Sequence, residues 1–262
     1  MNRPLAIVLT LPLIGVAPSL EVARLDGTLS IMELSKERLL ANLRDVRDRI
    51  AAAAARSGRP ASAVRLVAVT KTVSIDTIRL LVRAGQKNLG ENRPQQLRDR
   101  AAALTDLDIT WHMIGHLQRN KVKYVVPTAA MIHSVDSLAL AEEIGKRAHA
   151  AGARAACLLE VNVSGEASKS GVSPAEAPAL ASAAAALPGI DLAGLMTMAP
   201  IAEDAETVRP VFVGLRELRD RINRETSLPR PLTELSMGMT QDYEVAVEEG
   251  ATIVRIGTAL FQ

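Results

Sequence analysis

The chain has 262 residues, with 31 Lys and Arg against 29 Asp and Glu, so its formal net charge is only +2. This balance, together with one Trp, two Tyr and two Phe, argues against the basic surfaces and aromatic platforms by which proteins bind nucleic acid. The single cysteine, Cys157, excludes an intramolecular disulfide and a multi-cysteine metal site, and it favours the reducing cytoplasm.

The N-terminal segment has two interpretations. Arg3 precedes an apolar run over residues 5–17, which has the outline of a signal peptide but is too short to span a membrane. Alternatively, Met32 stands just before a strong helix pattern, so that residues 1–31 form an extension outside the fold. We favour the second interpretation and expect residues 32–262 to form the folded domain, without a membrane partner.

The first predicted element is an amphipathic helix. Ser30 and Glu33 have the spacing of a capping box. Apolar residues then recur at intervals of four, three and four, at Leu39, Leu43, Val46 and Ile50. Gly58 and Pro60 mark its end.

A strand and a second helix come next. Residues 66–69 are continuously apolar, as in strands that are buried on both faces, and Lys71 stands at the carboxyl end. Ser74 is placed to cap the following helix, and Gly85 to end it.

The same alternation continues to the end of the chain. Ser173 and Glu176 predict another helix start, and Thr240 is expected to cap a helix that ends at Gly250. Eight strands in one domain of this length favour an α/β fold, a closed (β/α)8 TIM barrel, with an open doubly wound sheet as the alternative. The other seven strands are expected near 88–90, 110–114, 131–134, 156–163, 192–196, 232–235 and 252–256.

Lys71 is the first candidate for chemistry, because active sites of parallel barrels lie at the carboxyl ends of the strands. Burial there would lower the pKa of its amine and allow a Schiff base with an aldehyde. The alternative is a lysine that extends into solvent.

Arg255 places a permanent charge inside the apolar strand near residues 252–256. A buried guanidinium requires a partner, since an unpaired buried charge costs several kcal/mol, about 3–5 when an existing partner is removed. That partner is either an internal carboxylate or a ligand.

Two segments near the C-terminus predict a site for a phosphorylated ligand. Gly257 and Thr258 follow the last strand, where barrels commonly bind phosphate. Ser236, Gly238 and Thr240 lead into a helix N-terminus, whose N–H groups favour an anion.

Other reactive residues carry weaker signals. Asn92 is either a ligand contact or a turn residue. His112 and His116 have the spacing of a zinc pair on a helix, but they flank a strand end, so we expect no metal site. Cys157 lies in an apolar strand and is expected in the core.

Together these pieces resemble one known family, the pyridoxal-phosphate homeostasis proteins. The resemblance runs from about Leu34 to Phe261. It rests on ordered blocks: VAVTKTV around Lys71, NLGEN at 88–92, WHMIGHLQRNK at 111–121, IHSVD at 132–136, EVNVSGEASKSGV at 160–172, GLMTMAP at 194–200, LSMGMTQDYEVAVEEGA at 235–251 and VRIGTALF at 254–261.

The resemblance implies a barrel of the alanine-racemase N-terminal type that holds pyridoxal 5′-phosphate (PLP) as an internal aldimine on Lys71. It also implies that Arg255 faces the pyridine nitrogen and that the phosphate lies at the last two strands. Thr240 replaces the usual serine, keeping the hydroxyl and adding a methyl group. The expected cofactor-binding residues are Lys71, Asn92, Ser236, Gly238, Thr240, Arg255, Gly257 and Thr258.

The family further implies a cytoplasmic carrier or regulator in vitamin B6 homeostasis, without a known reaction of its own. A charged guanidinium beside the pyridine nitrogen keeps that nitrogen unprotonated, which weakens the ring as an electron sink. We expect a monomer without the second domain of racemases, whose partners are PLP and PLP-dependent apo-enzymes. The alternatives are a racemase-like enzyme, with Tyr243, His116 or Asn92 as second acid or base, and a cofactor-free interaction protein.

Overall fold

The computed structural model describes residues 22–25, 28–31, 35–166 and 169–262. It divides into two compact units, Met1–Ser35 and Lys36–Gln262. In the first unit, β1 (Val22–Leu25) and β2 (Thr28–Ile31) pair as an antiparallel hairpin. The signal-like run at 5–17 lies outside the described residues.

The predicted helix cap at Ser30 is wrong. Ser30 belongs to β2, and α1 begins at Lys36, so the start of the helix is displaced from the capping-box pattern. Glu33, the other half of that pattern, lies outside the described residues. The apolar face of α1 is confirmed, since all four of its predicted core positions are buried: Leu39, Leu43, Val46 and Ile50.

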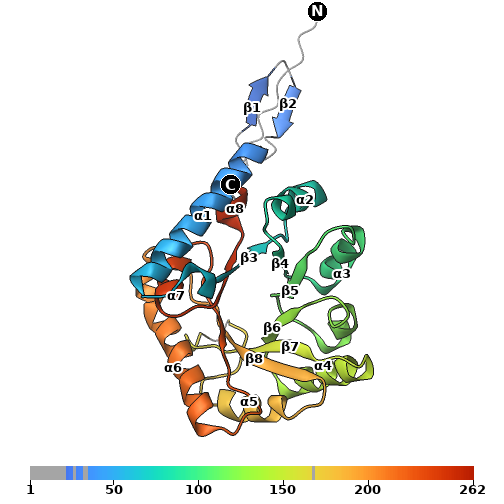
Figure 1. Ribbon diagram of the computed structural model, residues 1–262, viewed down its shortest axis with the longest axis vertical. Coiled ribbons are helices and arrows are strands. Elements are labelled where there is room, and N and C mark those ends of the chain that lie inside the picture. Colours follow the sequence, from blue (N-terminus) through green and yellow to red (C-terminus); the bar gives the residue numbers. More distant parts are fainter. Residues whose placement is uncertain (1–21, 26–27, 32–34, 167–168) are drawn as a thin grey trace, which may run out of the picture. The chain divides into compact units, whose positions relative to one another are not determined.

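The second unit is a closed barrel of eight parallel strands in the order β10-β3-β4-β5-β6-β7-β8-β9 (Figure 1). This confirms the predicted TIM barrel and each of its eight strands, with bounds shifted by a few residues. The strands are β3 (Arg65–Val69), β4 (Asn88–Glu91), β5 (Thr110–Met113), β6 (Met131–Val135), β7 (Ala155–Glu160), β8 (Ile190–Met196), β9 (Glu234–Ser236) and β10 (Ile253–Ile256).

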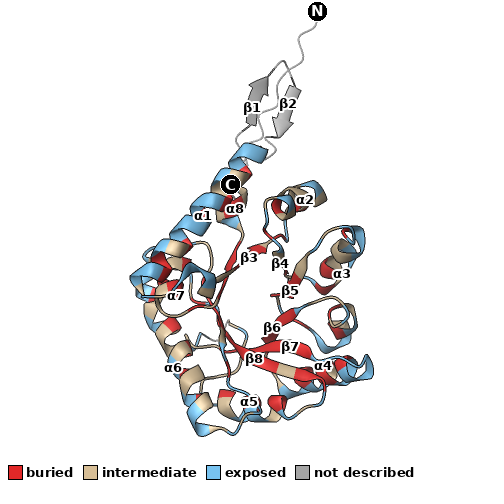
Figure 2. Cartoon of the chain, in the orientation of Figure 1, coloured by how far each residue is buried: buried red, intermediate tan, exposed pale blue. Residues whose placement is uncertain are grey.

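Helices surround the barrel. Figure 2 shows buried strands and helices whose outer faces are exposed. The segment between β5 and β6 contributes only a 3₁₀ helix. The α-helices are α1 (Lys36–Arg56), α2 (Ile75–Arg83), α3 (Pro94–Ala103), α4 (Leu138–Ala150), α5 (Ala177–Ala185), α6 (Arg209–Glu225), α7 (Tyr243–Glu248) and α8 (Thr258–Phe261), and the 3₁₀ helices are η1 (Ala61–Ala63), η2 (Arg119–Tyr124) and η3 (Ala205–Val208). Among the described residues, no helix combines the length and the apolar content needed to cross a membrane.

The predicted helix start at Ser74 is confirmed. The hydroxyl of Ser74 accepts from the backbone N–H of Thr77 at 3.2 Å and so caps α2, satisfying an N–H group that a helix start leaves without a partner. Ser173 and Glu176 form the reciprocal bonds of a capping box, with the backbone N of Ser173 3.0 Å from Glu176 Oε2, but these bonds close a turn before the helix. Helix α5 begins only at Ala177, so the predicted start at Ser173 is displaced by one turn.

The predicted cap at Thr240 is wrong. Helix α7 begins only at Tyr243, and the carboxylate of Asp242 accepts from the backbone N–H of Met239 at 2.6 Å. Thr240 Oγ1 instead accepts from the backbone N–H of Ala259, at 3.4 Å. The loop before α7 is therefore connected to the start of α8.

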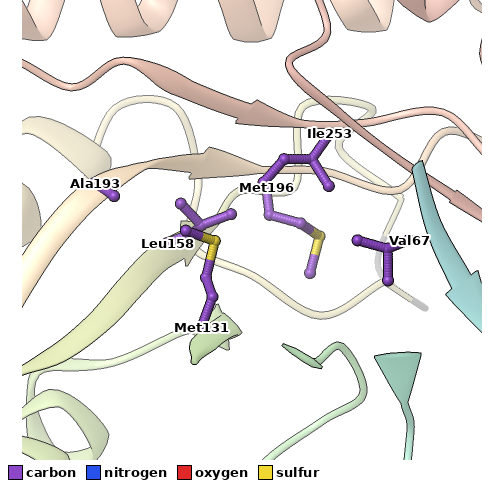
Figure 3. Packing of buried hydrophobic residues seen from close by; sticks show 6 residues of the cluster. All are labelled: Val67, Met131, Leu158, Ala193, Met196 and Ile253. Carbon is purple, nitrogen blue, oxygen red and sulfur yellow. The ribbon is translucent and has the colours of Figure 1, made fainter. Parts of the chain in front are cut away.

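A packed apolar cluster connects opposite walls of the barrel. Figure 3 shows side chains from β3 and β10 converging with others from β6, β7 and β8. Because the cluster fills space between the strands, polar side chains gather at other levels of the barrel. Its members are Val67, Met131, Leu158, Ala193, Met196 and Ile253.

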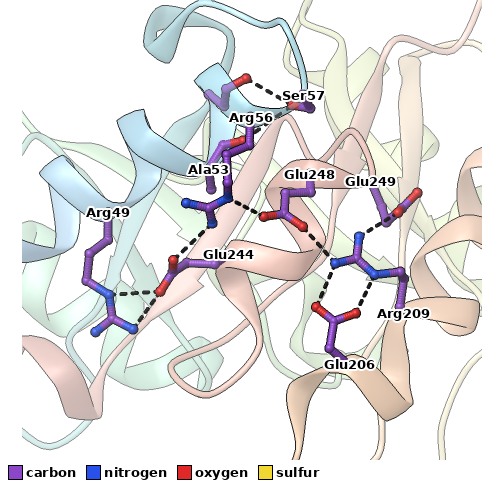
Figure 4. Close-up of polar contacts among 10 residues, drawn as sticks. Arg49, Ala53, Arg56, Ser57, Glu206, Arg209, Glu244, Glu248 and Glu249 are labelled. Atoms are coloured by element: carbon purple, nitrogen blue, oxygen red, sulfur yellow. Dashed lines mark hydrogen bonds and ion pairs between the residues drawn. The ribbon is translucent and has the colours of Figure 1, made fainter.

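A network of ion pairs attaches α7 to its neighbours (Figure 4). Arg49 and Arg56 of α1 pair with Glu244 and Glu248 of α7, with closest distances of 2.6 Å in each case. Arg209, at the start of α6, also pairs with Glu248 at 2.7 Å. Individual exposed pairs contribute little, about 0–1 kcal/mol, but shared partners fix the helix that follows the β9 loop.

Candidate functional site

Lys71 lies in a turn beyond the carboxyl end of β3, which ends at Val69. Its side chain is exposed, so the predicted burial is wrong at this position. The residue lines an open polar pocket together with Asn92, Arg93 and Gln96. The amine is therefore accessible to a ligand from solvent.

Asn92 follows β4 and lines the same pocket. Among the described side chains, its Oδ1 is one of three buried atoms without a hydrogen-bond partner. The neighbouring chain passes very close: a Cβ at Gly115 would lie 2.3 Å from the carbonyl oxygen of Asn92. Asn92 thus offers an unsatisfied acceptor beside Lys71, and Gly115 is a packing requirement that the sequence analysis missed.

Arg255 is inside the barrel on β10, with 4% of its surface exposed. Its Nη1 donates to Ser236 Oγ at 2.6 Å and its Nη2 to the carbonyl of Thr197 at 2.9 Å. Burial lowers the pKa of the guanidinium to about 10, so it stays charged at neutral pH.

No carboxylate of the described residues forms an ion pair with Arg255; Asp242 and Glu160 act on it from a greater distance. Of the two partners that the sequence left open, the internal ion pair is absent from this part of the chain. Two of the five N–H groups of the guanidinium are used in the bonds above. The others are available to an acceptor.

A chain of hydrogen bonds leads from Arg255 through the barrel. Ser236 Oγ lies 2.8 Å from His133 Nδ1, and His133 Nε2 lies 2.9 Å from His112 Nδ1. His112 Nε2 is 3.2 Å from Asn88 Oδ1. We expected Ser236 to contact the ligand. It has no exposed surface, and its hydroxyl instead bonds to Arg255.

His112 and His133, the two histidines in this chain of hydrogen bonds, are neutral. Burial lowers the pKa of His112 to about 3, and burial together with neighbouring positive charge puts the pKa of His133 well below its usual value. Since Arg255 can only donate, Ser236 accepts from it and donates to His133 Nδ1. His133 Nε2–H then donates to His112, and His112 Nε2–H to Asn88, so every donor in the chain points away from Arg255.

The predicted phosphate-binding residues come together where β9, β10 and β3 end. The backbone N–H of Arg255 donates to the carbonyl of Gly238 at 3.0 Å, and Thr240 contacts the backbone of Ala259. A Cβ at Gly257 would lie 3.4 Å from Cβ of Val69, two residues before Lys71. The hydroxyl of Thr240, which can still donate, and the start of α8 therefore lie close to the lysine turn.

Acidic groups also occur at this level of the barrel. Glu160, at the end of β7, and Asp242 are 3% and 6% exposed, and burial raises the pKa of each carboxyl. Neither carboxylate was predicted as a site residue. Their position after strand ends was the available signal, but carboxylates are common in such loops.

The other predicted candidates are placed as follows. His112 lies in the barrel interior, whereas His116 is exposed, 3.5 Å from the carboxylate of Asp136. Within the described ranges, no group of three His, Cys, Asp or Glu side chains could hold a metal ion. Cys157 is buried in β7, as predicted, and burial raises the pKa of its thiol.

Tyr243, the candidate second base of the enzyme alternative, is 1% exposed. Its ring lies 5.4 Å from the guanidinium of Arg49 on α1, and its hydroxyl has no hydrogen-bond partner among the described residues. Burial raises its pKa to about 12, so it is protonated at neutral pH. It is thus a buried contact of α7 with α1.

The chemistry of these residues suits a phosphorylated aromatic aldehyde, although the pocket that Lys71 lines includes no residue of β9, β10 or α8. An accessible amine lies on the turn after β3, a charged guanidinium lies on β10, and hydroxyl groups lie at Thr240 and at the start of α8. Asn92 adds an unsatisfied buried acceptor. Each requirement that the resemblance implied for PLP has a residue of suitable chemistry.

Comparison with known proteins agrees with this geometry. The family described as "Alanine racemase, N-terminal domain" matches residues 41–262. The pyridoxal phosphate homeostasis protein of Aquifex aeolicus is 48% identical over 216 residues, which cover 82% of this chain and 94% of the relative. That of Escherichia coli K12 is 38% identical over 223 residues, covering 84% and 94%.

A solved structure is similar as well. PipY of Synechococcus elongatus PCC7942, described with PLP bound, superposes with a TM-score of 0.74 at 36% identity and covers 86% of this chain and 100% of its own. Matches of this identity and coverage extend over the whole barrel. The chain therefore belongs to the family of pyridoxal phosphate homeostasis proteins, which is built on the alanine racemase N-terminal domain.

Proposed function

We propose that this protein binds PLP and takes part in PLP homeostasis in the cell. The proposal is supported by relatives named pyridoxal phosphate homeostasis protein at 37–48% identity and by a similar protein whose structure is described with PLP bound. The observation that carries it is Arg255, a buried guanidinium with no described carboxylate paired to it and with only two of its five N–H groups in hydrogen bonds to described residues.

In this proposal Lys71 holds PLP covalently. Its neutral amine adds to the aldehyde, and loss of one water leaves a C=N bond, so no oxidant or reductant is needed. Arg255 faces the pyridine nitrogen, while Thr240, Gly257 and Thr258 bind the phosphate. Ser236 supports Arg255 through its hydrogen bond, and Gly238 sets the path of the loop that carries Thr240. Asn92 lines the same pocket as Lys71.

We also propose that the protein acts as a carrier or regulator without a reaction of its own. When bound, PLP supplies an electron sink for carbanion chemistry, and a charged Arg255 weakens that sink because it disfavours protonation of the ring nitrogen. Tyr243 is packed against α1 and supports no acid or base role beside Lys71. We place the protein in the cytoplasm as a monomer, with PLP-dependent apo-enzymes as recipients.

Borohydride reduction of the PLP-treated protein, followed by peptide mapping, tests the covalent assignment. We expect one labelled peptide that contains Lys71, no label in Lys71→Arg, and wild-type labelling in the control Lys87→Arg, whose side chain pairs with Asp108 at 2.5 Å. A label on a different lysine would overturn the assignment of Lys71. Protein that gains no visible absorption with PLP would overturn the cofactor proposal.

A second experiment addresses catalysis. The purified PLP-loaded protein is incubated with single-enantiomer amino acids, and optical rotation is followed. We expect no change beyond that of free PLP. Sustained turnover that disappears in Lys71→Arg would show a racemase-like enzyme.

A further inference from the structure

We propose that helix α3 positions Lys71, through a strap formed by Glu91, Gln96 and Arg100. This inference rests on the proposed function, in which Lys71 is the reactive amine. Lys71 is exposed in a turn after β3, so the strand pairing of the barrel does not itself hold the residue. The strap supplies contacts that do.

The strap binds the backbone of the turn over residues 70–73. Arg100 donates through Nη1 to the carbonyl of Thr70 and through Nη2 to the carbonyl of Val73, the latter at 2.6 Å. Gln96 Nε2 donates to the carbonyl of Lys71 itself, at 2.9 Å. Two side chains of α3 thus hold three carbonyls of the turn.

Glu91 fixes the guanidinium that makes these contacts. Its carboxylate has no exposed surface and forms an ion pair with Arg100, which is 12% exposed. The same oxygen, Oε1, accepts from the hydroxyl of Thr70 at 2.5 Å. A planar guanidinium holds its five donors in a fixed fork, so Arg100 binds two carbonyls and a carboxylate together in one defined geometry. The strap is therefore a connected unit that includes the strand end, the turn and α3.

The strap fixes the direction in which the Lys71 side chain leaves the backbone, because it holds the backbone of that residue in place. The lysine side chain has four rotatable bonds, so a loose turn spreads the amine over many positions, few of which meet a bound aldehyde. Misplacement by about 1 Å costs up to roughly 100-fold in reactions that depend on alignment. We therefore expect the strap to affect bond formation by Lys71 more than recognition of the ring or phosphate.

The principal variant is Arg100→Gln, and its control is Arg98→Gln on the same helix, where the arginine pairs with Asp99 and lies 4.8 Å from the ring of Tyr124. Two ligands are compared: PLP, and an analogue in which a methyl group replaces the aldehyde. We expect Arg100→Gln to weaken PLP binding about 10-fold and analogue binding less than about 2-fold, and Arg98→Gln to change neither. Equal losses for both ligands, or no loss, would overturn the strap.

A cofactor-free measurement separates this inference from the proposed function. The rate at which acetic anhydride acetylates Lys71 in the unloaded protein is measured by mass spectrometry, with Lys87 as the internal reference. We expect this rate to change at least about 2-fold in Arg100→Gln, since freeing the turn alters the surroundings of the amine. Failure of the wild-type protein to bind PLP would reject the proposed function. An acetylation rate of Lys71 that is unchanged in Arg100→Gln would reject the strap, whether or not PLP binds.

Gln96→Leu keeps the inference testable if Arg100→Gln does not fold. Gln96 makes a single contact with the turn and is only half-buried, so its loss leaves the ion pair of Glu91 and Arg100 in place. We expect a smaller selective loss of PLP binding, about 3-fold, with unchanged analogue binding. Gln96→Glu, which has no N–H to donate, should reproduce the loss, and wild-type PLP binding in both variants would contradict the role of Gln96.

Discussion

Arg255 shows how a single residue is kept charged inside the barrel at a cost in free energy. Its two hydrogen bonds, to Ser236 and Thr197, offset part of the desolvation of the guanidinium, and each is worth about 1.5–3 kcal/mol because the donor is charged. The desolvation itself costs several kcal/mol. In the unloaded protein these contributions nearly cancel, so the residue serves ligand binding more than folding.

We therefore predict that Arg255→Met separates stability from affinity. Removing the charge removes both the hydrogen bonds and the desolvation cost, so we expect the free energy of unfolding to change by less than about 2 kcal/mol. PLP affinity should fall at least about 10-fold, because a charged hydrogen bond to the ring is lost. Urea denaturation and absorbance titration measure the two quantities.

The control for this prediction is Arg154→Met. Arg154 also donates to a backbone carbonyl, that of Ile190, but it does so at the opposite end of the strands. It should leave PLP affinity unchanged. An affinity loss in Arg154→Met similar to that in Arg255→Met would show that general loosening of the barrel is responsible.

At the scale of elements, the loop between β9 and α7 has its path fixed by Gly238. This glycine has φ +93°, and a Cβ there would lie 2.6 Å from Cβ of Ala246 and 2.9 Å from Cα of Tyr243. The carbonyl of Gly238 also accepts from the backbone of Arg255. Glycine is required here for conformation and for space, and the loop holds Thr240 beside α8 as a result.

We predict that Gly238→Ala destabilises the protein by about 2–4 kcal/mol, since strain at positive φ adds to overpacking against α7. Gly58→Ala is the matched control: Gly58 has φ +69°, but a Cβ there meets nothing within 4 Å. The control isolates the cost of positive φ, about 1 kcal/mol. Urea denaturation measures both, and equal costs at the two glycines would contradict a steric role of α7.

At the scale of the whole molecule, the sequence predicted the barrel well because its strands are buried on both faces. Continuous apolar runs such as residues 66–69 are readable without knowing their neighbours. The cap at Thr240 and the burial of Lys71 were wrong, because both depend on the path of the backbone after a strand ends. Loops take that path from tertiary contacts, such as the one between Thr240 and Ala259.

The partners of the site residues were also beyond prediction from the sequence. Thr197 and Ser236, which bind Arg255, lie 58 and 19 residues away in the chain, and they meet it only because the barrel is closed. The strap on Lys71 uses Arg100, whose exposed neighbours Arg98 and Asp99 give it no distinguishing pattern. Pairings of this kind follow from register and closure, which composition does not encode.

Closure of the barrel also buries His112 and His133, and this gives the whole molecule a pH dependence. Burial lowers the pKa of His112 from 6.5 to about 3 and that of His133 well below 6.5, so both stay neutral while their unfolded counterparts titrate near 6.5. Between these values the unfolded state binds more protons than the folded state. Stability therefore rises with pH up to about 6.5 and, for these groups, is constant above it.

Glu160 and Asp242 act in the opposite direction, because burial raises their pKa values and the folded state holds their protons longer. Glu160 and Asp242 are present in both wild type and His112→Gln, so their contribution to the pH dependence of stability cancels when the two proteins are compared. We predict that the difference in unfolding free energy is constant above pH 6.5. Below it, wild type loses stability relative to the variant, by a few kcal/mol at most on the scale of 1.36 kcal/mol per pKa unit.

Urea denaturation at a series of pH values measures this difference, with His149→Gln, at an exposed histidine of α4, as the control. The control should run parallel to wild type, since His149 is exposed and takes no part in the buried chain of hydrogen bonds. Parallel curves for His112→Gln would mean that the buried histidine also takes up its proton in the folded protein. The one-way chain of donors from Arg255 to Asn88 would then be broken at His112, because a protonated imidazole has no acceptor for His133.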